Sequence, residues 1–167
     1  MKTIEETFIV PCSVDTFWNT FLDEQYMRKL FADVLAFKEF DILELTPTGR
    51  KVRTVPRMNL PAVIEKLVGD TFAYEEHGTL DRAGNTWRWK MAQDGGGKKK
   101  KELVATHGSI RVEPLADGKC RRINSATVEG KVFGLGGVIE SAAEKEIRAA
   151  WAKEAVFLNE WLQKPKP

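Results

Sequence analysis

Glu76 and Tyr74 are the residues whose types and spacing could support acid–base chemistry. They stand two positions apart in the segment from Thr71 to Asp81, which has the composition of a β-strand. Residues two apart on a strand share a face, so a carboxyl group and a phenol would point the same way. In an apolar interior the pKa of this carboxyl would rise, which suits a general acid or a ligand anchor. The alternative is a bulge or a register change that returns Glu76 to water.

Other sequence motifs that could support catalysis or ligand binding are incomplete. Gly134-Leu135-Gly136-Gly137 lies between a strand and a helix, as a phosphate-binding loop would, but Ile139 stands where a dinucleotide fingerprint has its third glycine. We interpret this segment as a hinge. Cys-x-x-Cys, His-x-x-x-His and Gly-x-Ser-x-Gly patterns do not occur, so the sequence predicts no metal ligand set, no nucleophile and no cofactor. His77 and His107 are predicted on the solvent side of their strands.

Four lysines in a row, Lys98 to Lys101, follow three glycines. The run fits a solvated hairpin tip, or a point of transient contact with anionic lipid headgroups. Aromatic residues do not interleave with it, and the formal net charge of the chain is only +2. Both facts argue against nucleic acid as a partner.

Cys12 and Cys120 are the two cysteines of the chain. They stand at the end of the first predicted strand and the start of the last, which could be antiparallel neighbours. A bridge between the two sulfur atoms is then the alternative, and reduced thiols in a cytoplasmic setting are the expectation. The longest uncharged apolar stretch near a helix, Val132 to Ile139, is far too short for a transmembrane span.

The elements that must position Glu76 and Tyr74 follow from hydrophobic periodicity and turn signals. A first strand closed by Pro11 precedes two short helices, capped by Ser13 and Asp23. A short amphipathic helix over Asn59 to Val68 and a long one over Val138 to Gln163 are also predicted. The seven predicted strands are Thr3–Val10, Phe37–Leu45, Lys51–Arg57, Thr71–Asp81, Thr86–Gln93, Leu103–Pro114 and Lys119–Glu129.

Two hairpin turns allow registers to be predicted. A turn centred on Ala83-Gly84 places Glu76 opposite Met91 and Gly78 opposite Trp89. A turn at Asp117-Gly118 pairs Val112 with Ile123, Ile110 with Ser125, and Gly108 with Thr127, and it puts Glu113 beside Arg122 on the solvent face. Several inner-face residues of the second hairpin are then small or hydroxylated, whereas a filled core favours larger side chains. Either the sheet encloses a cavity with a few polar groups, or the long helix packs tightly on those small residues. The residues predicted to line such a cavity are Phe72, Tyr74, Glu76, Trp87, Trp89, Met91, Val104, Thr106, Ile110, Ser125, Thr127, Ile139, Ala143, Ile147 and Trp151.

The order of one strand, two short helices, six strands and a long C-terminal helix resembles the START-like superfamily, also called the SRPBCC or helix-grip superfamily. The segments VPCSVDTFWNTFLDEQY, MNLPAVIEKLVGD and VEGKVFGLGGVIE are similar to those of an uncharacterised bacterial START-like family. The resemblance covers the whole chain. It implies an α+β helix-grip fold, with a curved antiparallel sheet of about seven strands wrapped on the long C-terminal helix. It carries over no catalytic residue, because the superfamily shares no catalytic set.

The resemblance also implies a function class. We expect one START-like domain over 1–163 with a frayed tail at 164–167, acting in the cytoplasm as a monomer or dimer. The first hypothesis is a binding protein for a hydrophobic small molecule or lipid, held between the sheet and the long helix. The second is a polyketide cyclase, dehydratase or hydrolase that uses Glu76 with Tyr74. The third is a closed structural or interaction domain whose interior is filled by aromatic rings.

Overall fold

The computed structural model describes residues 1–69, 72–94 and 101–164. Of the lysine run from Lys98 to Lys101 only Lys101 is described, and of the predicted tail only Lys164. The elements in chain order are β1 (Lys2–Val10), α1 (Val14–Phe21), α2 (Glu24–Lys29), the π-helical turn η1 (Leu30–Val34), β2 (Glu39–Thr46), β3 (Gly49–Val55), α3 (Ala62–Val68), β4 (Ala73–Asp81), β5 (Thr86–Asp94), β6 (Val104–Pro114), the 3₁₀ turn η2 (Ala116–Gly118), β7 (Cys120–Gly130) and α4 (Gly136–Gln163).

Helices begin and end where local chemistry dictates. The Ser13 hydroxyl accepts the amide of Thr16 at 3.2 Å, and the Asp23 carboxylate accepts the amide of Tyr26 at 2.9 Å. Each bond satisfies a first-turn amide that has no partner within its helix. α3 ends at Gly69, whose φ of +69° favours a residue without a Cβ. The predicted caps are therefore confirmed.

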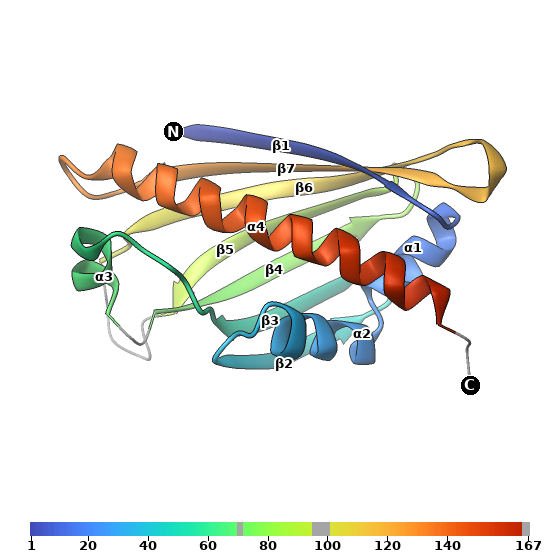
Figure 1. Cartoon of the computed structure of the whole chain (residues 1–167), viewed down its shortest axis with the longest axis horizontal. Coiled ribbons are helices and arrows are strands. Elements are labelled where there is room, and N and C mark those ends of the chain that lie inside the picture. The colour runs from blue at the N-terminus through green and yellow to red at the C-terminus, as the bar shows by residue number, and fades with distance from the viewer. Residues whose placement is uncertain (70–71, 95–100, 165–167) are drawn as a thin grey trace.

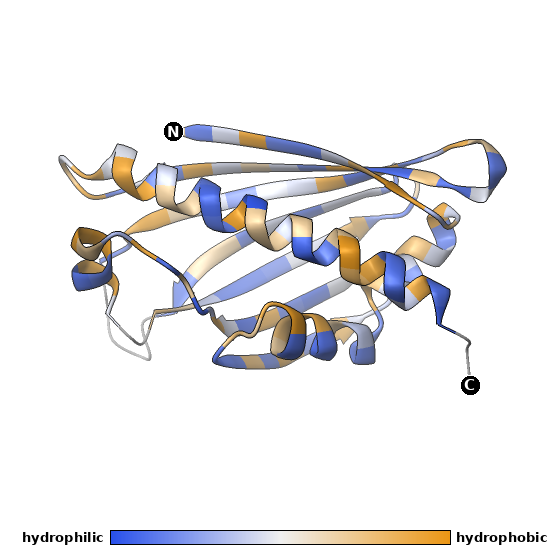
Figure 2. Cartoon of the chain, viewed as in Figure 1, coloured by the Kyte–Doolittle hydropathy of each residue, from blue (hydrophilic) through white to orange (hydrophobic). Residues whose placement is uncertain are grey.

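The seven strands form one curved antiparallel sheet in the order β1-β7-β6-β5-β4-β3-β2. Figure 1 shows α4 crossing one face of this sheet, with α3 near its N-terminal end and α1 and α2 near its C-terminal end. Hydrophilic and hydrophobic residues alternate along the strands, as Figure 2 shows, because successive side chains point to opposite faces. Among the described residues no helix is both long and apolar enough to cross a membrane.

The register of β4 and β5 matches the prediction. Glu76 lies opposite Met91, and Gly78 lies opposite Trp89. The indole that fills the space over Gly78 is nevertheless that of Trp87, since a Cβ on Gly78 would lie 1.9 Å from the Trp87 ring. Trp89 instead covers Gly108, where an added Cβ would lie 2.6 Å from its ring.

The predicted register of β6 and β7 is wrong by one residue. Val112 lies opposite Arg122, where Ile123 was expected. The cause is the length of the turn: Pro114 pairs with Cys120 and the Leu115 amide donates to the Lys119 carbonyl at 2.9 Å, so the loop is the three residues of η2 and not the two-residue turn predicted at Asp117-Gly118. A slip of one residue moves every side chain of a strand to the opposite face.

This slip exchanges the two faces of β7. Arg122 and Asn124 point inward and are buried, with 2% and 0% exposure. Glu113 meets Arg121 at 3.4 Å on the outer face, where Arg122 had been predicted. The residues moved from the predicted interior to the outer face are Ile123, Ser125 and Thr127.

The most densely packed part of the core lies where α1, α2 and the C-terminal half of α4 meet the sheet. Trp18 of α1 is fully buried. Phe21 reaches from α1 to the ring of Trp87 on the sheet, with the ring centroids 5.2 Å apart. Tyr26 of α2 stacks on Phe157 of α4 at 5.3 Å. Aromatic rings therefore fill this end of the interior.

Candidate functional site

A cavity of about 230 Å³ lies between the sheet and α4. Its walls come from strands β3 to β7, from α1 and η1, from the segment after β3, and from α4. Eleven of the residues predicted to face the interior line it: Tyr74, Glu76, Trp87, Trp89, Met91, Val104, Thr106, Ile110, Ala143, Ile147 and Trp151.

The other four residues predicted for the cavity lie elsewhere. Phe72 and Ile139 line a smaller hollow of about 70 Å³, to which α3 contributes Ile64. Ser125 and Thr127 face outward because of the register of β7. The two hollows share Met58 and Val104 among other lining residues, so they adjoin one another beneath α4.

Glu76 is buried, with 9% exposure, so the alternative that returned it to water is wrong. Arg50 donates to one of its carboxylate oxygens, Oε1, from Nε at 3.3 Å and from Nη2 at 2.9 Å. Arg50 lies opposite Gly78 on β4, and Glu76 is two residues along the same strand. Because Gly78 has no side chain, the guanidinium of Arg50 can lie across its position and contact Glu76, its diagonal neighbour.

Aromatic rings hold the guanidinium of Arg50 in place. Its central carbon lies 4.4 Å from the centroid of Phe21 and 5.4 Å from that of Trp87, both within the range of cation–π attraction. Within the described part of the chain, Nη1 of Arg50 and Oε2 of Glu76 have no hydrogen-bond partner. Since both residues line the cavity, one donor and one acceptor remain free to bind a molecule inside it.

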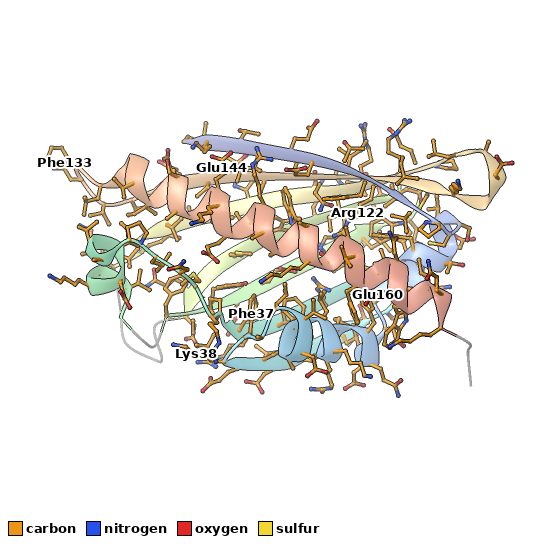
Figure 3. All side chains as sticks on the ribbon, viewed as in Figure 1. Phe37, Lys38, Arg122, Phe133, Glu144 and Glu160 are labelled. Carbon is orange, nitrogen blue, oxygen red and sulfur yellow. The ribbon has the colours of Figure 1, made fainter. Side chains whose placement is uncertain are left out.

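A second buried ion pair in the cavity lining joins Arg122, which is labelled in Figure 3, to Glu154. Arg122 of β7 engages both carboxylate oxygens of Glu154 on α4 at 3.1 Å each, a bidentate pair. Its remaining donor, Nε, donates to the side-chain oxygen of Asn124, Oδ1, at 2.8 Å. All three side chains are almost entirely removed from solvent, so this pair fixes α4 to the sheet.

Both tyrosines of the chain are kept in their neutral form. Burial raises the pKa of Tyr74 well above its ordinary value, and the nearby charge of Glu76 raises it further. Burial also raises the pKa of Tyr26, with the charge of Glu154 acting in the same direction. Tyr74 therefore presents a protonated phenol, a hydrogen-bond donor, to the cavity.

Cys12 and Cys120 are both free and buried. A hydrogen bond between the two thiols raises the pKa of Cys12, and burial raises it further. In the part of the chain that the structure describes, no group of three or more His, Cys, Asp or Glu residues could hold a metal ion. The site thus combines two buried ion pairs, a phenol and mostly apolar walls, with the more exposed Arg57, Glu146 and Lys153 also in its lining.

Sequence reasoning missed Arg50, Arg122 and Glu154. Two of them carried a readable signal. Arg50 is two residues before Val52, so alternation along β3 places it on the inner face, but the strand was predicted to begin only at Lys51. Glu154 is three residues after Trp151 and therefore on the same side of the predicted helix as that cavity residue. Arg122 carried none, because its inward position depends on the conformation of η2.

Comparison with known proteins gives a family match and several structural neighbours. A family model described as "Protein of unknown function (DUF2505)" matches residues 5–162. No curated protein matches the chain.

Three solved structures illustrate the structural neighbours. The Zhui aromatase/cyclase from Streptomyces sp. R1128 has a TM-score of 0.70 at 14% identity, covering 97% of this chain and 96% of that one. Norcoclaurine synthase from Thalictrum flavum, in complex with dopamine and hydroxybenzaldehyde, has a TM-score of 0.67 at 19% identity, covering 99% and 89%. Ara h 8.0201 has a TM-score of 0.64 at 14% identity, covering 95% and 98%. At these identities the likeness shows the fold alone, and it confirms the predicted helix-grip fold.

Proposed function

Because the chain belongs to the family described as "Protein of unknown function (DUF2505)" and has a helix-grip fold, we propose that it binds a small, rigid, mostly apolar molecule with polar substituents. The binding place is the cavity between the sheet and α4. The observation that carries the proposal is the Arg50–Glu76 pair, buried in an aromatic wall yet with one donor and one acceptor left for a ligand.

The size of the cavity limits the ligand. An apolar cavity of about 150 Å³ accommodates benzene, and sites for drug-sized ligands begin at about 300 Å³. A volume of about 230 Å³ therefore fits one or two rings and is small for a lipid with two acyl chains. Norcoclaurine synthase, which shares the fold, was crystallised with two one-ring aromatic compounds, dopamine and hydroxybenzaldehyde.

The polar groups define where the substituents go. Nη1 of Arg50 can donate to a carbonyl or hydroxyl oxygen, and Oε2 of Glu76 can accept from a neighbouring hydroxyl. The Tyr74 phenol supplies a further donor in the same cavity. A phenol or hydroxy-ketone satisfies the pair, whereas a pure hydrocarbon leaves both groups unbonded and is disfavoured.

The test is a cavity-filling substitution with a matched control on the same helix. Ala150 lines the cavity, and Ala152 is exposed on α4. We expect hydroxybenzaldehyde to bind the wild-type protein and Ala152→Phe alike in calorimetry, and Ala150→Phe to bind at least about tenfold more weakly. Native mass spectrometry reports a co-purified ligand in the same samples. Equal binding to Ala150→Phe, or no binding of one- and two-ring phenols to the wild type, overturns the proposal.

A second candidate function is an enzyme of the cyclase or dehydratase type. It is favoured by the position of Glu76 and Tyr74 in the wall of one cavity, where a carboxylate and a neutral phenol can both reach a bound molecule. Glu76→Gln separates the two functions, because the amide still bonds Arg50 but takes up no proton. Conversion of a bound phenol by the wild type and not by Glu76→Gln supports catalysis. Unchanged ligand recovered from both proteins supports binding alone.

A further inference from the structure

On the outer face of the sheet, eight neighbouring side chains can donate hydrogen bonds, and none of these eight is a carboxylate. They form two adjacent rows across β4, β5, β6 and β7, as the pairing of these strands shows. We call these eight residues the outer grid. One row is His77, Lys90, His107 and Thr127, and the other is Thr79, Arg88, Ser109 and Ser125.

The cations of the outer grid are largely uncompensated. Lys90 lies directly between the two histidines, and Arg88 is two residues along the same strand. Within the described residues, Arg88, Lys90 and His107 make no ion pair and no side-chain hydrogen bond, and all three are exposed. Only His77 has an acidic partner, Glu75, at 3.1 Å.

Acidic side chains border the grid on both sides: Glu75 lies on β4, Glu5 of β1 lies opposite Ser125, and Glu129, which pairs with Lys131, is two residues from Thr127 on β7. Lys51 of β3 lies opposite His77 and so continues the first row of the grid onto β3. Its Nζ atom is 3.6 Å from Oε2 of Glu75. A shallow hollow of about 460 Å³ borders the grid there, lined by Lys51, His77, Thr79, Arg88 and Lys90, with Glu44 and Thr46 also contributing.

Arg88 and Lys90 are two residues apart on one face of β5, so their like charges repel and an anion bound over both would relieve the repulsion. Cations interleaved with hydroxyl groups are the donors that bind phosphate and sulfate oxygens. Four strands about 4.8 Å apart and residues about 7 Å apart along each strand give a grid of roughly 14 by 7 Å. We propose that the outer grid binds an anion that bears two or more phosphate or sulfate groups.

The outer grid lies on the face of the sheet opposite the cavity. Arg88 and Lys90 alternate with Trp87 and Trp89, which line the cavity. None of the eight grid residues lines the cavity, whereas Arg50 and Trp89 border both the cavity and the hollow beside the grid.

The test uses inorganic tripolyphosphate, with sodium chloride at matched ionic strength as the reference. Calorimetry is run on the wild type, on Arg88→Gln/Lys90→Gln, and on Lys29→Gln/Lys66→Gln, which removes two exposed charges from α2 and α3. We expect saturable binding by the wild type and the control, weakened by salt, and a loss of at least about tenfold in the grid variant. Equal weakening in both variants, or no saturable heat above the chloride reference, overturns the proposal.

Amide chemical shifts locate the site. Saturable shifts centred on His107, Ser109, Ser125 and Thr127 support the outer grid, and shifts centred elsewhere overturn it. Vesicles of phosphatidylcholine with and without phosphatidylinositol bisphosphate distinguish the source of the phosphate. Tighter binding to the bisphosphate vesicles than to free tripolyphosphate, lost in the grid variant, assigns the anion to a lipid headgroup. Weaker binding assigns it to a soluble polyphosphorylated molecule.

Discussion

Arg50 and Glu76 form an ion pair between neighbouring strands with only 6% and 11% of their side chains exposed. Their closest atoms, Nη2 and Oε1, are 2.9 Å apart. Removing one partner of a buried pair leaves a charge without compensation, which costs about 3–5 kcal/mol, whereas replacing both with apolar groups is often close to neutral.

We therefore expect Glu76→Ala to lower the free energy of unfolding by about 3–5 kcal/mol in urea denaturation. The double variant Arg50→Met/Glu76→Leu is expected to recover most of this loss while abolishing binding in the cavity. Such a result assigns the pair to ligand binding. A double variant as unstable as Glu76→Ala would instead assign it to the fold.

Arg121 and Arg122 provide a test of the β7 register. Arg122 is buried against Glu154, whereas Arg121 meets Glu113 near the surface with 43% of its side chain exposed. We expect Arg122→Ala to destabilise the protein by about 3–5 kcal/mol and Arg121→Ala by no more than about 1 kcal/mol. Chemical denaturation of the two single variants measures both. The reverse order would restore the register that the sequence suggested.

Gly78 is expected to tolerate no side chain. An added Cβ would lie 1.9 Å from the ring of Trp87, which is fully buried and packed against Phe21. Gly78→Ala should therefore cost about 1–3 kcal/mol or more through displacement of the indole. Gly137→Ala is the control, since nothing lies within 4 Å of its added Cβ and alanine is favoured in a helix. Comparable stability of both variants in thermal melts would contradict the packing of Trp87.

The two tyrosines make stability depend on alkaline pH. Both have a pKa raised by burial, so folding favours the neutral phenols. Their contribution is complete below the pKa of an unfolded tyrosine, about 10, and is lost as the pH rises above it. We expect near-ultraviolet absorbance to report no phenolate in the folded protein just above pH 10, and its sudden appearance on unfolding. A gradual titration of one tyrosine in the folded state would contradict the burial described here.

Local signals predicted most of the fold. The caps at Ser13 and Asp23 and the register of β4 and β5 depend on residues close in sequence, and each is confirmed. The interior of β7 depends on the length of the loop at η2, and Asp117-Gly118 is compatible with a turn of two residues as well as with the three-residue turn that is present. The partner of Glu76 could not be predicted either, because Arg50 comes from a strand whose register against β4 had no short turn to fix it.

The two buried ion pairs have a consequence for what can enter the interior. Arg50 cancels Glu76 and Arg122 cancels Glu154, so the buried charges of the cavity sum to zero while their dipoles remain. A molecule that carries a full charge would lose its hydration without gaining a counter-charge, whereas a neutral dipole loses little. Occupancy of the cavity should thus be indifferent to ionic strength, so salt titration separates ligands of the interior from those of the outer grid.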